Sequence, residues 1–185
     1  MNVLRLLPVL LVLPFAAHAV DLPLKIDKSR SFVDVDVDAT KNFTAHLDNY
    51  DAKMVADDAG KVKNALFSFH FADLRTGDGK RDEAMLKWLG GGQPDGKFEL
   101  GNLALTPTGQ GQASGRLTFH GVTERIEFPV DVSRAGGTVT ITGETTIDYR
   151  TWGLKVIRSF MVLTVNPEVK VRFKFTGVMP ETPKG

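Results

Sequence analysis

Most of the chain alternates apolar and polar residues with a period of two. In the clearest stretch, 168–176, Val169, Val171, Phe173 and Phe175 are separated by polar or charged residues. Such alternation predicts strands that bury one face and expose the other to water. The same pattern covers 32–38, 126–133 and 138–148, and further strands are predicted at 43–57, 62–71, 98–107, 113–120 and 160–166.

One segment breaks this pattern with helical spacing. Within 82–89, Met85, Leu86 and Leu89 fall on one side of a helix, Asp78 is a predicted N-cap, and a run of three glycines follows as a stop signal. Eight or nine antiparallel strands with one short helix predict an all-β fold, either a sandwich or a closed barrel. The interior of a barrel of about eight strands is filled by side chains or holds one small ligand.

The first nineteen residues have the features of an export signal. Arg5 precedes an apolar run from Leu6 to Ala17, and Ala17-His18-Ala19 has the small-x-small pattern of a cleavage site. The alternative is a membrane anchor, but the run is well short of the ~20 residues that span a bilayer. We therefore expect 1–19 to be a signal peptide and 20–185 to form one exported domain.

Composition narrows the chemistry further. The 185 residues carry a formal charge of +1 and no cysteine. Disulfides, thiolate nucleophiles and Cys-based zinc sites are therefore excluded, and the one-sided basic surface of a nucleic-acid binder is not indicated. The histidines after the signal segment lie far apart, and the Asp34-Asp36-Asp38 ladder lacks the glycine and glutamate of a calcium loop. We expect neither a metal site nor a cofactor.

Phenylalanine is the unusual component, with 12 residues against two tryptophans and two tyrosines. Phe67, Phe69 and Phe71 share one face of a predicted strand. Two interpretations stay open: a well-packed core, or a barrel wider than its side chains fill and lined for an apolar ligand. The residues expected to line such an interior are Phe67, Phe69, Phe71, Met85, Trp88, Leu89, Phe98, Phe119, Phe128, Trp152 and Phe173.

Four stretches carry motifs that occur together in one known family. They read LKIDKSRSFV at 24–33, DLRTGDGKRDEAML at 73–86, GRLTFHGVT at 115–123 and IDYRTWGL at 147–154. In this order they resemble the YceI-like family, the lipocalin-like polyisoprenoid-binding proteins of bacterial periplasms, over about 24–178. The sequence departs from the family pattern in its glycine run, which stands where many members have an aromatic-rich segment.

The resemblance implies a lipocalin-like antiparallel barrel that holds an isoprenoid lipid, either a polyprenyl chain or an isoprenoid quinone. It also implies a periplasmic carrier that is not an enzyme and does not insert stably into a membrane. Burying hydrocarbon is favourable by ~0.8 kcal/mol per methylene, so a carrier of this kind needs an apolar tunnel and no catalytic group.

Two other functions are to be weighed against a carrier. An enzyme acting on a hydrophobic substrate would use Arg81 and Asp82, with His120 and Arg150 as further candidates. The competing interpretation is that Arg81 and Asp82 fix the helix over the barrel, because acidic residues stabilise a helix start. The other function is a non-catalytic stress-response partner of a membrane redox protein, which would need an exposed apolar patch. A homodimer also stays open.

The sequence also suggests where a ligand enters. Pro129 cannot donate a ladder hydrogen bond, so it predicts a bulge, a gap or a sheet edge. We predict that the helix closes one end of the barrel and that Met85, Trp88 and Leu89 touch the ligand. The glycine run after the helix is expected to let it move, since glycine restricts the backbone least.

Overall fold

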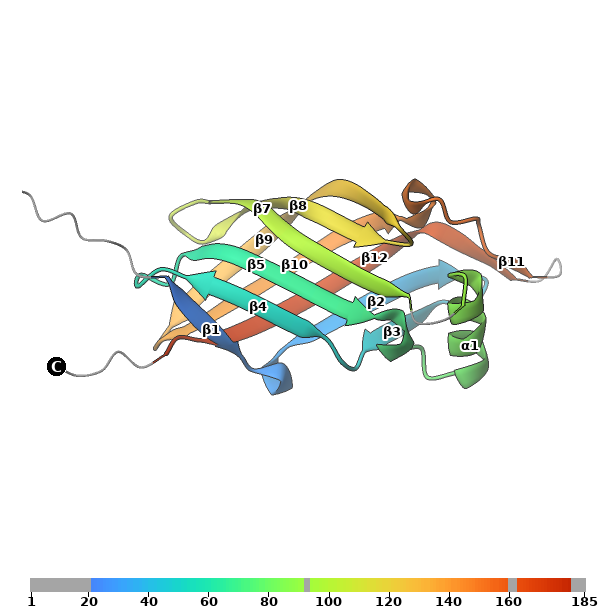
Figure 1. Ribbon diagram of the computed structural model, residues 1–185, viewed down its shortest axis with the longest axis horizontal. Helices are drawn as coiled ribbons and strands as arrows, with labels where there is room; N and C mark the ends of the chain where they lie inside the picture. Colours follow the sequence, from blue (N-terminus) through green and yellow to red (C-terminus); the bar gives the residue numbers. More distant parts are fainter. Residues whose placement is uncertain (1–20, 92–93, 160–162, 181–185) are drawn as a thin grey trace, which may run out of the picture.

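A closed antiparallel barrel is the central feature of the protein (Figure 1), one of the two folds that the alternating sequence allows and the one that the family resemblance implies. The structure, a computed structural model, describes residues 21–91, 94–159 and 163–180. The predicted signal peptide lies outside these residues. Eight strands close the barrel, in the order β1 (Leu22–Ile26), β4 (Asp51–Ala56), β5 (Val62–His70), β7 (Asp95–Leu105), β8 (Gln110–Phe119), β9 (Val122–Ala135), β10 (Thr138–Asp148) and β12 (Leu163–Val178).

The barrel closes where the last strand meets the first. β12 pairs with β10 along one edge, and on its other edge Val178 pairs with Lys25 of β1. Beyond β1 the same edge of β12 pairs with β2 (Phe32–Ala39), which continues through β3 (Phe43–Leu47) to β6 (Leu74–Arg75). Short 3-10 helices and a two-stranded extension complete the fold, namely η1 (Lys28–Arg30), η2 (Phe71–Asp73), η3 (Tyr149–Trp152) and β11 (Arg158–Ser159).

The two ends of the barrel differ in what covers them. At one end, called here the hairpin end, the turns 57–61, 106–109 and 136–137 come together, and β1 begins and β12 ends there (Figure 1). At the other, called here the helix end, lie η3, β11 and α1 (Gly79–Trp88), the one α-helix within the described residues.

The helix starts earlier than its apolar spacing indicates, at Gly79 rather than at residue 82. The predicted N-cap is confirmed, since the Asp78 carboxylate accepts hydrogen bonds from the backbone N–H groups of Lys80 and Arg81. The predicted stop is confirmed too: the helix ends at Trp88, and Gly90 follows with a φ of 101°, which disfavours any residue with a side chain.

The predicted strand 43–57 is wrong as a single element. It divides into β3 and β4 because residues 48–50 turn the chain away from β2, so that β4 pairs with β1 instead. The predicted strand 160–166 is also wrong in its bounds. Residues 160–162 lie outside the described residues, and residue 163 begins β12, which runs without interruption to residue 178.

Pro129 marks an edge, as predicted. The ladder between β9 and β10 runs from the pair Ala135 and Thr138 to the pair Val130 and Gly143, one residue short of Pro129. On the helix-end side of this proline the two strands separate. The 3-10 helix η3, which follows β10, lies against β9 in this region. The wall of the barrel is therefore completed there by η3 rather than by a strand.

Candidate functional site

The aromatic side chains of the interior form one continuous path of ring contacts. Centroids of successive rings lie 4.6–5.7 Å apart, within the range of favourable aromatic pairs. The structure thus brings eight of the eleven predicted lining residues onto one path of ring contacts. In order, the path is Phe98, Phe128, Phe173, Phe175, Phe67, Phe69, Phe71, Phe119 and Trp152.

Several side chains on or beside this path remain partly accessible to solvent. The residues here called the aromatic middle face inward yet are only half-buried: Phe67, Phe69, Phe98, Val171 and Phe173. At the hairpin end the packing is tighter, since Ala56, Val62, Val132 and Val139 are 0–4 % exposed. Inward-facing side chains can keep accessible surface in a closed barrel only if they border space inside it or at its ends.

Trp152 fills the gap that opens beside Pro129. Its ring stacks on Phe119 with a centroid distance of 4.6 Å and an interplanar angle of 17°. Its indole N–H donates to the carbonyl of Leu117 over 3.1 Å, and its own carbonyl lies 2.9 Å from Nδ1 of His120. Trp152 is 2 % exposed and belongs to a second apolar cluster at the helix end, so it seals the wall there.

The helix residues predicted to touch a ligand take three different positions. Leu89 is buried in the helix-end cluster, and Met85 is half-buried against both that cluster and the main core. Trp88 donates its indole N–H to the carbonyl of Lys155 over 2.9 Å and meets the ring of Tyr149 edge-on at 5.0 Å. The helix is thus fastened to the segment after η3, and Met85 is the helix residue that packs against the core.

Arg81 and Asp82 do not form a pair with each other. Asp82 is 7 % exposed and accepts hydrogen bonds from the backbone N–H and the hydroxyl of Thr76, at 2.9 and 2.6 Å. The Arg81 guanidinium stacks over the ring of Phe43 at 4.0 Å. Both side chains therefore fix α1 to neighbouring segments, which is the structural role weighed above. His120 and Arg150, the other candidates for catalysis, are exposed and lie in a turn and in η3.

Tyr50 is an interior residue that sequence reasoning missed. Its ring contacts Phe67 and Phe175 at 5.5 and 5.7 Å, and among the described residues no hydrogen-bond partner meets its buried hydroxyl. Burial raises the pKa of this hydroxyl, and the nearby Ser31 lowers it less. The signal was readable in part, since the apolar phase shifts from odd positions before residue 48 to even positions from Tyr50 onward.

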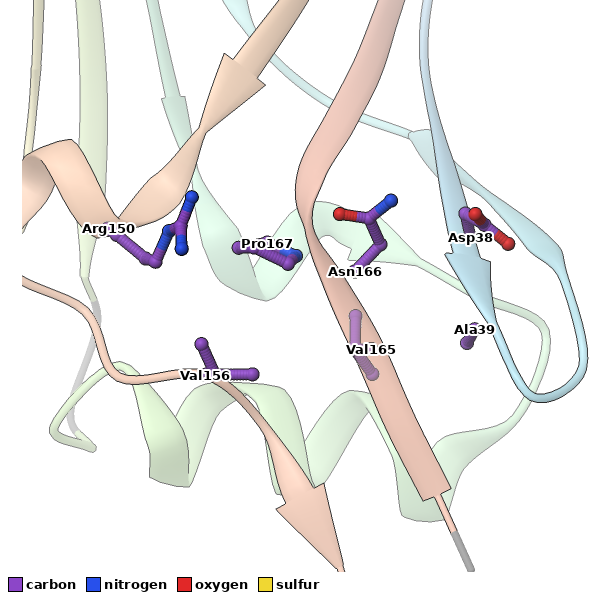
Figure 2. Close-up of a pocket in the computed structure, with 7 residues that line it drawn as sticks. All are labelled: Asp38, Ala39, Arg150, Val156, Val165, Asn166 and Pro167. Atoms are coloured by element: carbon purple, nitrogen blue, oxygen red, sulfur yellow. The ribbon is translucent and has the colours of Figure 1, made fainter.

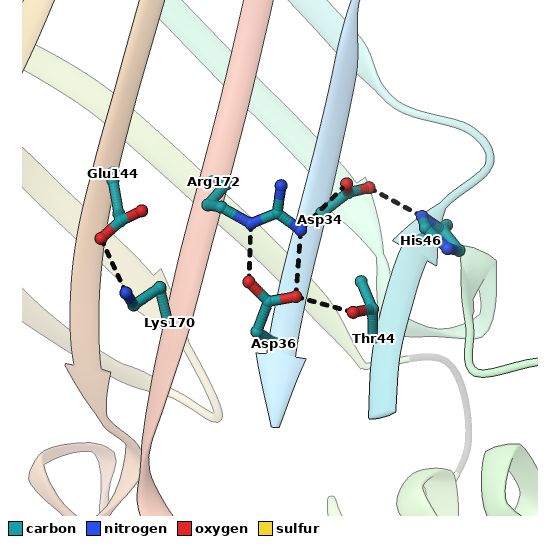
Figure 3. A network of polar contacts seen from close by, with 7 residues as sticks. All are labelled: Asp34, Asp36, Thr44, His46, Glu144, Lys170 and Arg172. Atoms are coloured by element: carbon teal, nitrogen blue, oxygen red, sulfur yellow. Dashed lines mark hydrogen bonds and ion pairs between the residues drawn. The ribbon is translucent and has the colours of Figure 1, made fainter. Parts of the chain in front are cut away.

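The solvent-facing side of β12, β2 and β3 carries a charged network (Figure 3). Arg172 of β12 donates two hydrogen bonds to Asp36 of β2, at 2.6 and 3.0 Å, and Thr44 of β3 donates a third at 2.7 Å. These contacts lower the pKa of Asp36 to about 2, with Arg172 as the main cause. Asp34 lies beside them and contacts His46 at 2.8 Å. The network joins three strands from the solvent side.

Two open hollows lie outside the barrel wall near the helix end. The first, of about 460 Å³, lies where β12 bulges away from β2, and Figure 2 shows Arg150 and Asn166 at its edge. Arg150 is held there by Asp148 at 2.6 Å. The second, of about 580 Å³, shares Asp38 and Asn166 with the first. Neither is lined by the interior rings, so the barrel interior is the better candidate site for an apolar ligand.

The described residues limit other kinds of site. No group of three His, Asp or Glu side chains among them is placed to hold a metal ion. None of the helices in the described part of the chain is long and apolar enough to cross a membrane. Phe32, which is 40 % exposed, is the large hydrophobic side chain that stands out on the described surface, so an apolar docking patch is not evident there.

An eight-stranded closed barrel with an aromatic interior and one covering helix defines a lipocalin-like barrel. Within that class the sequence matches the YceI-like domain over residues 24–177. The chain therefore belongs to the YceI-like family, as the four motifs indicated.

Solved structures show the same fold at low sequence identity. BcnA of Burkholderia cenocepacia has a TM-score of 0.69 and 18 % identity, covering 82 % of this chain and 99 % of that one. A polyisoprenoid binding domain from Saccharophagus degradans has a TM-score of 0.67 and 17 % identity, covering 88 % of this chain and 100 % of that one. The YceI protein of Campylobacter jejuni has a TM-score of 0.63 and 15 % identity, covering 77 % of this chain and 87 % of that one. No curated protein matches this chain in sequence.

Proposed function

We propose that this protein binds the hydrocarbon chain of an isoprenoid lipid, a polyprenyl chain or an isoprenoid quinone, inside its barrel. The observation that carries the proposal is the continuous path of interior rings, several of which keep accessible surface although they face inward. Membership of the YceI-like family supports it, as does the description of the Saccharophagus degradans neighbour as a polyisoprenoid binding domain.

The expected driving force is hydrocarbon burial. Each methylene removed from water contributes ~0.8 kcal/mol, and aromatic side chains offer wide, stiff surfaces for it. A long isoprenoid chain cannot stay dissolved in an aqueous compartment, so a barrel that encloses it acts as a carrier or a store. Such a role needs no reaction, and Arg81 and Asp82, which an enzyme would use, are already engaged in fixing α1.

We propose further that the ligand enters at the helix end. The hairpin end is closed by small side chains packed to near-complete burial, whereas α1 is held by individual side-chain contacts of Trp88, Arg81 and Asp82 and by burial of Leu89. Release of those contacts, with the glycines at 90 and 91 as a hinge, would open the interior beside Met85. The proposed compartment is the periplasm, which follows from the signal peptide predicted at 1–19.

Native mass spectrometry of protein purified from the periplasm tests the proposal. We expect a discrete added mass that organic extraction releases as an isoprenoid lipid, together with a chain that begins near Val20. A variant with Phe173→Asp places a charge among the rings of the aromatic middle and should lose that mass. The matched control is Lys174→Asp on the outer face of the same strand. Protein that never carries a lipid, even after incubation with prenols, would overturn the proposal.

A further inference from the structure

Three glycines of the barrel wall lie directly beneath phenylalanine rings. Gly96 of β7 pairs with Phe69 of β5, and Gly143 of β10 pairs with Phe173 of β12. The third, Gly115 of β8, pairs with Leu100 of β7, but the ring of Phe98 from the same strand lies over it. In each case the ring occupies the place where a Cβ atom would otherwise project. The rings therefore lie flat against the wall and do not point toward the barrel axis.

The contact at Gly96 differs from the other two. A Cβ atom added there would overlap the ring of Phe69, and no other atom lies among its nearest neighbours. At Gly143 the added atom would meet Phe173 at 2.5 Å and also the backbone oxygen of Pro129 at 3.0 Å. A side chain at position 96 thus meets the ring of Phe69 before it meets any backbone atom.

Phe69 also holds a particular place along the interior. It contacts Phe67 in the aromatic middle at 5.5 Å and Phe71 at 5.0 Å, and Phe71 packs against the helix-end cluster. The ring therefore lies at the passage between the middle of the barrel and its helix end. A ring lifted from the wall at this point moves toward the axis, because the sheet backbone blocks movement outward.

From this geometry we infer that Gly96 sets the length of hydrocarbon chain that the barrel accepts, by keeping Phe69 flat against the wall. The inference rests on the proposed lipid-binding function and adds a specificity-determining pair to it. With Gly96 the interior is continuous past Phe69, so a long chain extends through it. With a side chain at position 96 the ring of Phe69 narrows the passage. Only a short chain then fits, on one side of that ring.

The test compares Gly96→Ala with wild type for binding of farnesol, a short prenol, and solanesol, a long one. Each methylene kept out of the interior weakens binding by roughly fourfold. In Gly96→Ala, exclusion of a few methylenes should therefore lower the affinity for solanesol by more than about tenfold. The affinity for farnesol should stay within about twofold of the wild-type value. The double variant Gly96→Ala/Phe69→Leu removes the obstructing ring and should restore solanesol binding.

The control is Gly101→Ala on the same strand, where an added Cβ meets its nearest atom, the Ser114 backbone oxygen, at 3.4 Å. It should bind both prenols as wild type does. Equal loss of both prenols in Gly96→Ala, or no loss of either, would overturn the inference. If Gly96→Ala does not fold, Phe69→Trp enlarges the same ring and carries the same expectation. Wild-type protein that binds neither prenol would instead refute the proposed function itself.

Discussion

The hairpin end and the aromatic middle belong to one barrel but differ in how their inward-facing side chains pack. At the hairpin end, Ala56, Val62, Val132 and Val139 are packed to 0–4 % exposure. In the aromatic middle, much larger side chains are only half-buried. Small branched side chains interdigitate and leave few voids, whereas rings that lie over glycines cover the wall without reaching the axis. Larger residues thus fill less of the interior here than smaller ones do.

The two regions also differ in how their ends are held. At the hairpin end, Arg134 donates a hydrogen bond to the carbonyl of Gly60 over 2.7 Å, which ties two turns together. At the helix end, beyond the aromatic middle, the cover is a helix held by side-chain contacts such as that of Trp88 with Lys155. A barrel with a single entrance requires one end that stays closed and another that can open. The following experiments test whether the hairpin end and the helix end differ in this way.

The largest effect on stability is expected from replacing a valine by alanine, a change that can be compared between the two regions. Val139→Ala removes two methyl groups from a 2 % exposed position, so the free energy of unfolding should fall by about 2–3 kcal/mol. Val171→Ala, in the aromatic middle, should cost less than about 1 kcal/mol because its neighbours already leave space. Urea denaturation with equal m-values measures both. Equal losses would mean that the middle is as densely packed as the hairpin end.

A second comparison tests the cover at the helix end. Trp88→Ala removes the contacts with Lys155 and Tyr149 but takes away a half-buried side chain, so the loss of stability should be roughly 1–2 kcal/mol. Lipid retention during purification should fall more steeply than stability does. Trp88→Phe, which keeps a ring but not the hydrogen bond, should fall in between. A sharp drop in Tm with unchanged lipid content would make Trp88 an ordinary packing residue.

The outer network gives a perturbation that should spare the interior. The folded state holds the pKa of Asp36 near 2, below its ordinary value of 3.8. Its stabilising contribution is therefore complete above about pH 4 and is lost as the pH falls toward 2. Because the pair is partly exposed, we expect less than about 1 kcal/mol. Asp36→Asn should flatten this part of the pH profile and leave lipid content unchanged; a change in lipid content would link the outer wall to the interior.

The smallest effect is expected at Tyr50, which tests what occupies the space near the aromatic middle. Its buried hydroxyl has no hydrogen-bond partner in the part of the chain that the structure describes, so Tyr50→Phe should leave the ligand-free protein equally stable or more stable by up to about 1 kcal/mol. Chemical denaturation of delipidated protein measures this. Destabilisation beyond about 1 kcal/mol would show that water or Ser31 binds the hydroxyl, and that the interior is wetter than the rings suggest.

Much of the fold was predictable because one wall face is wet and the other apolar. The alternation at 138–148 gives the bounds of β10 without error. The predicted strand 43–57 is wrong because the apolar phase changes within it: Leu47 is the last inward residue of one register and Tyr50 the first of the next. Such phase shifts mark breaks and bulges, and they are visible in the sequence once sought.

The candidate site was predictable in composition but not in shape. Inward-facing rings could be named from the apolar phase of each strand. That Phe69 lies over Gly96 depends on the pairing of β5 with β7, and that register is fixed by the folded sheet. The role of Trp152 in the wall likewise depends on where β9 and β10 separate. Neither of these two contacts can be read from the spacing of residues along the chain.

The pairing of β12 has a consequence for how the molecule reaches its native state. β12, the last strand among the described residues, pairs with β10 on one edge and with β1 and β2 on the other, so the barrel closes only when segments far apart in the sequence meet. Contacts between such distant segments slow folding. The barrel should therefore remain open until β12 is available, a delay that would suit the export proposed above, in which the polypeptide crosses a membrane unfolded.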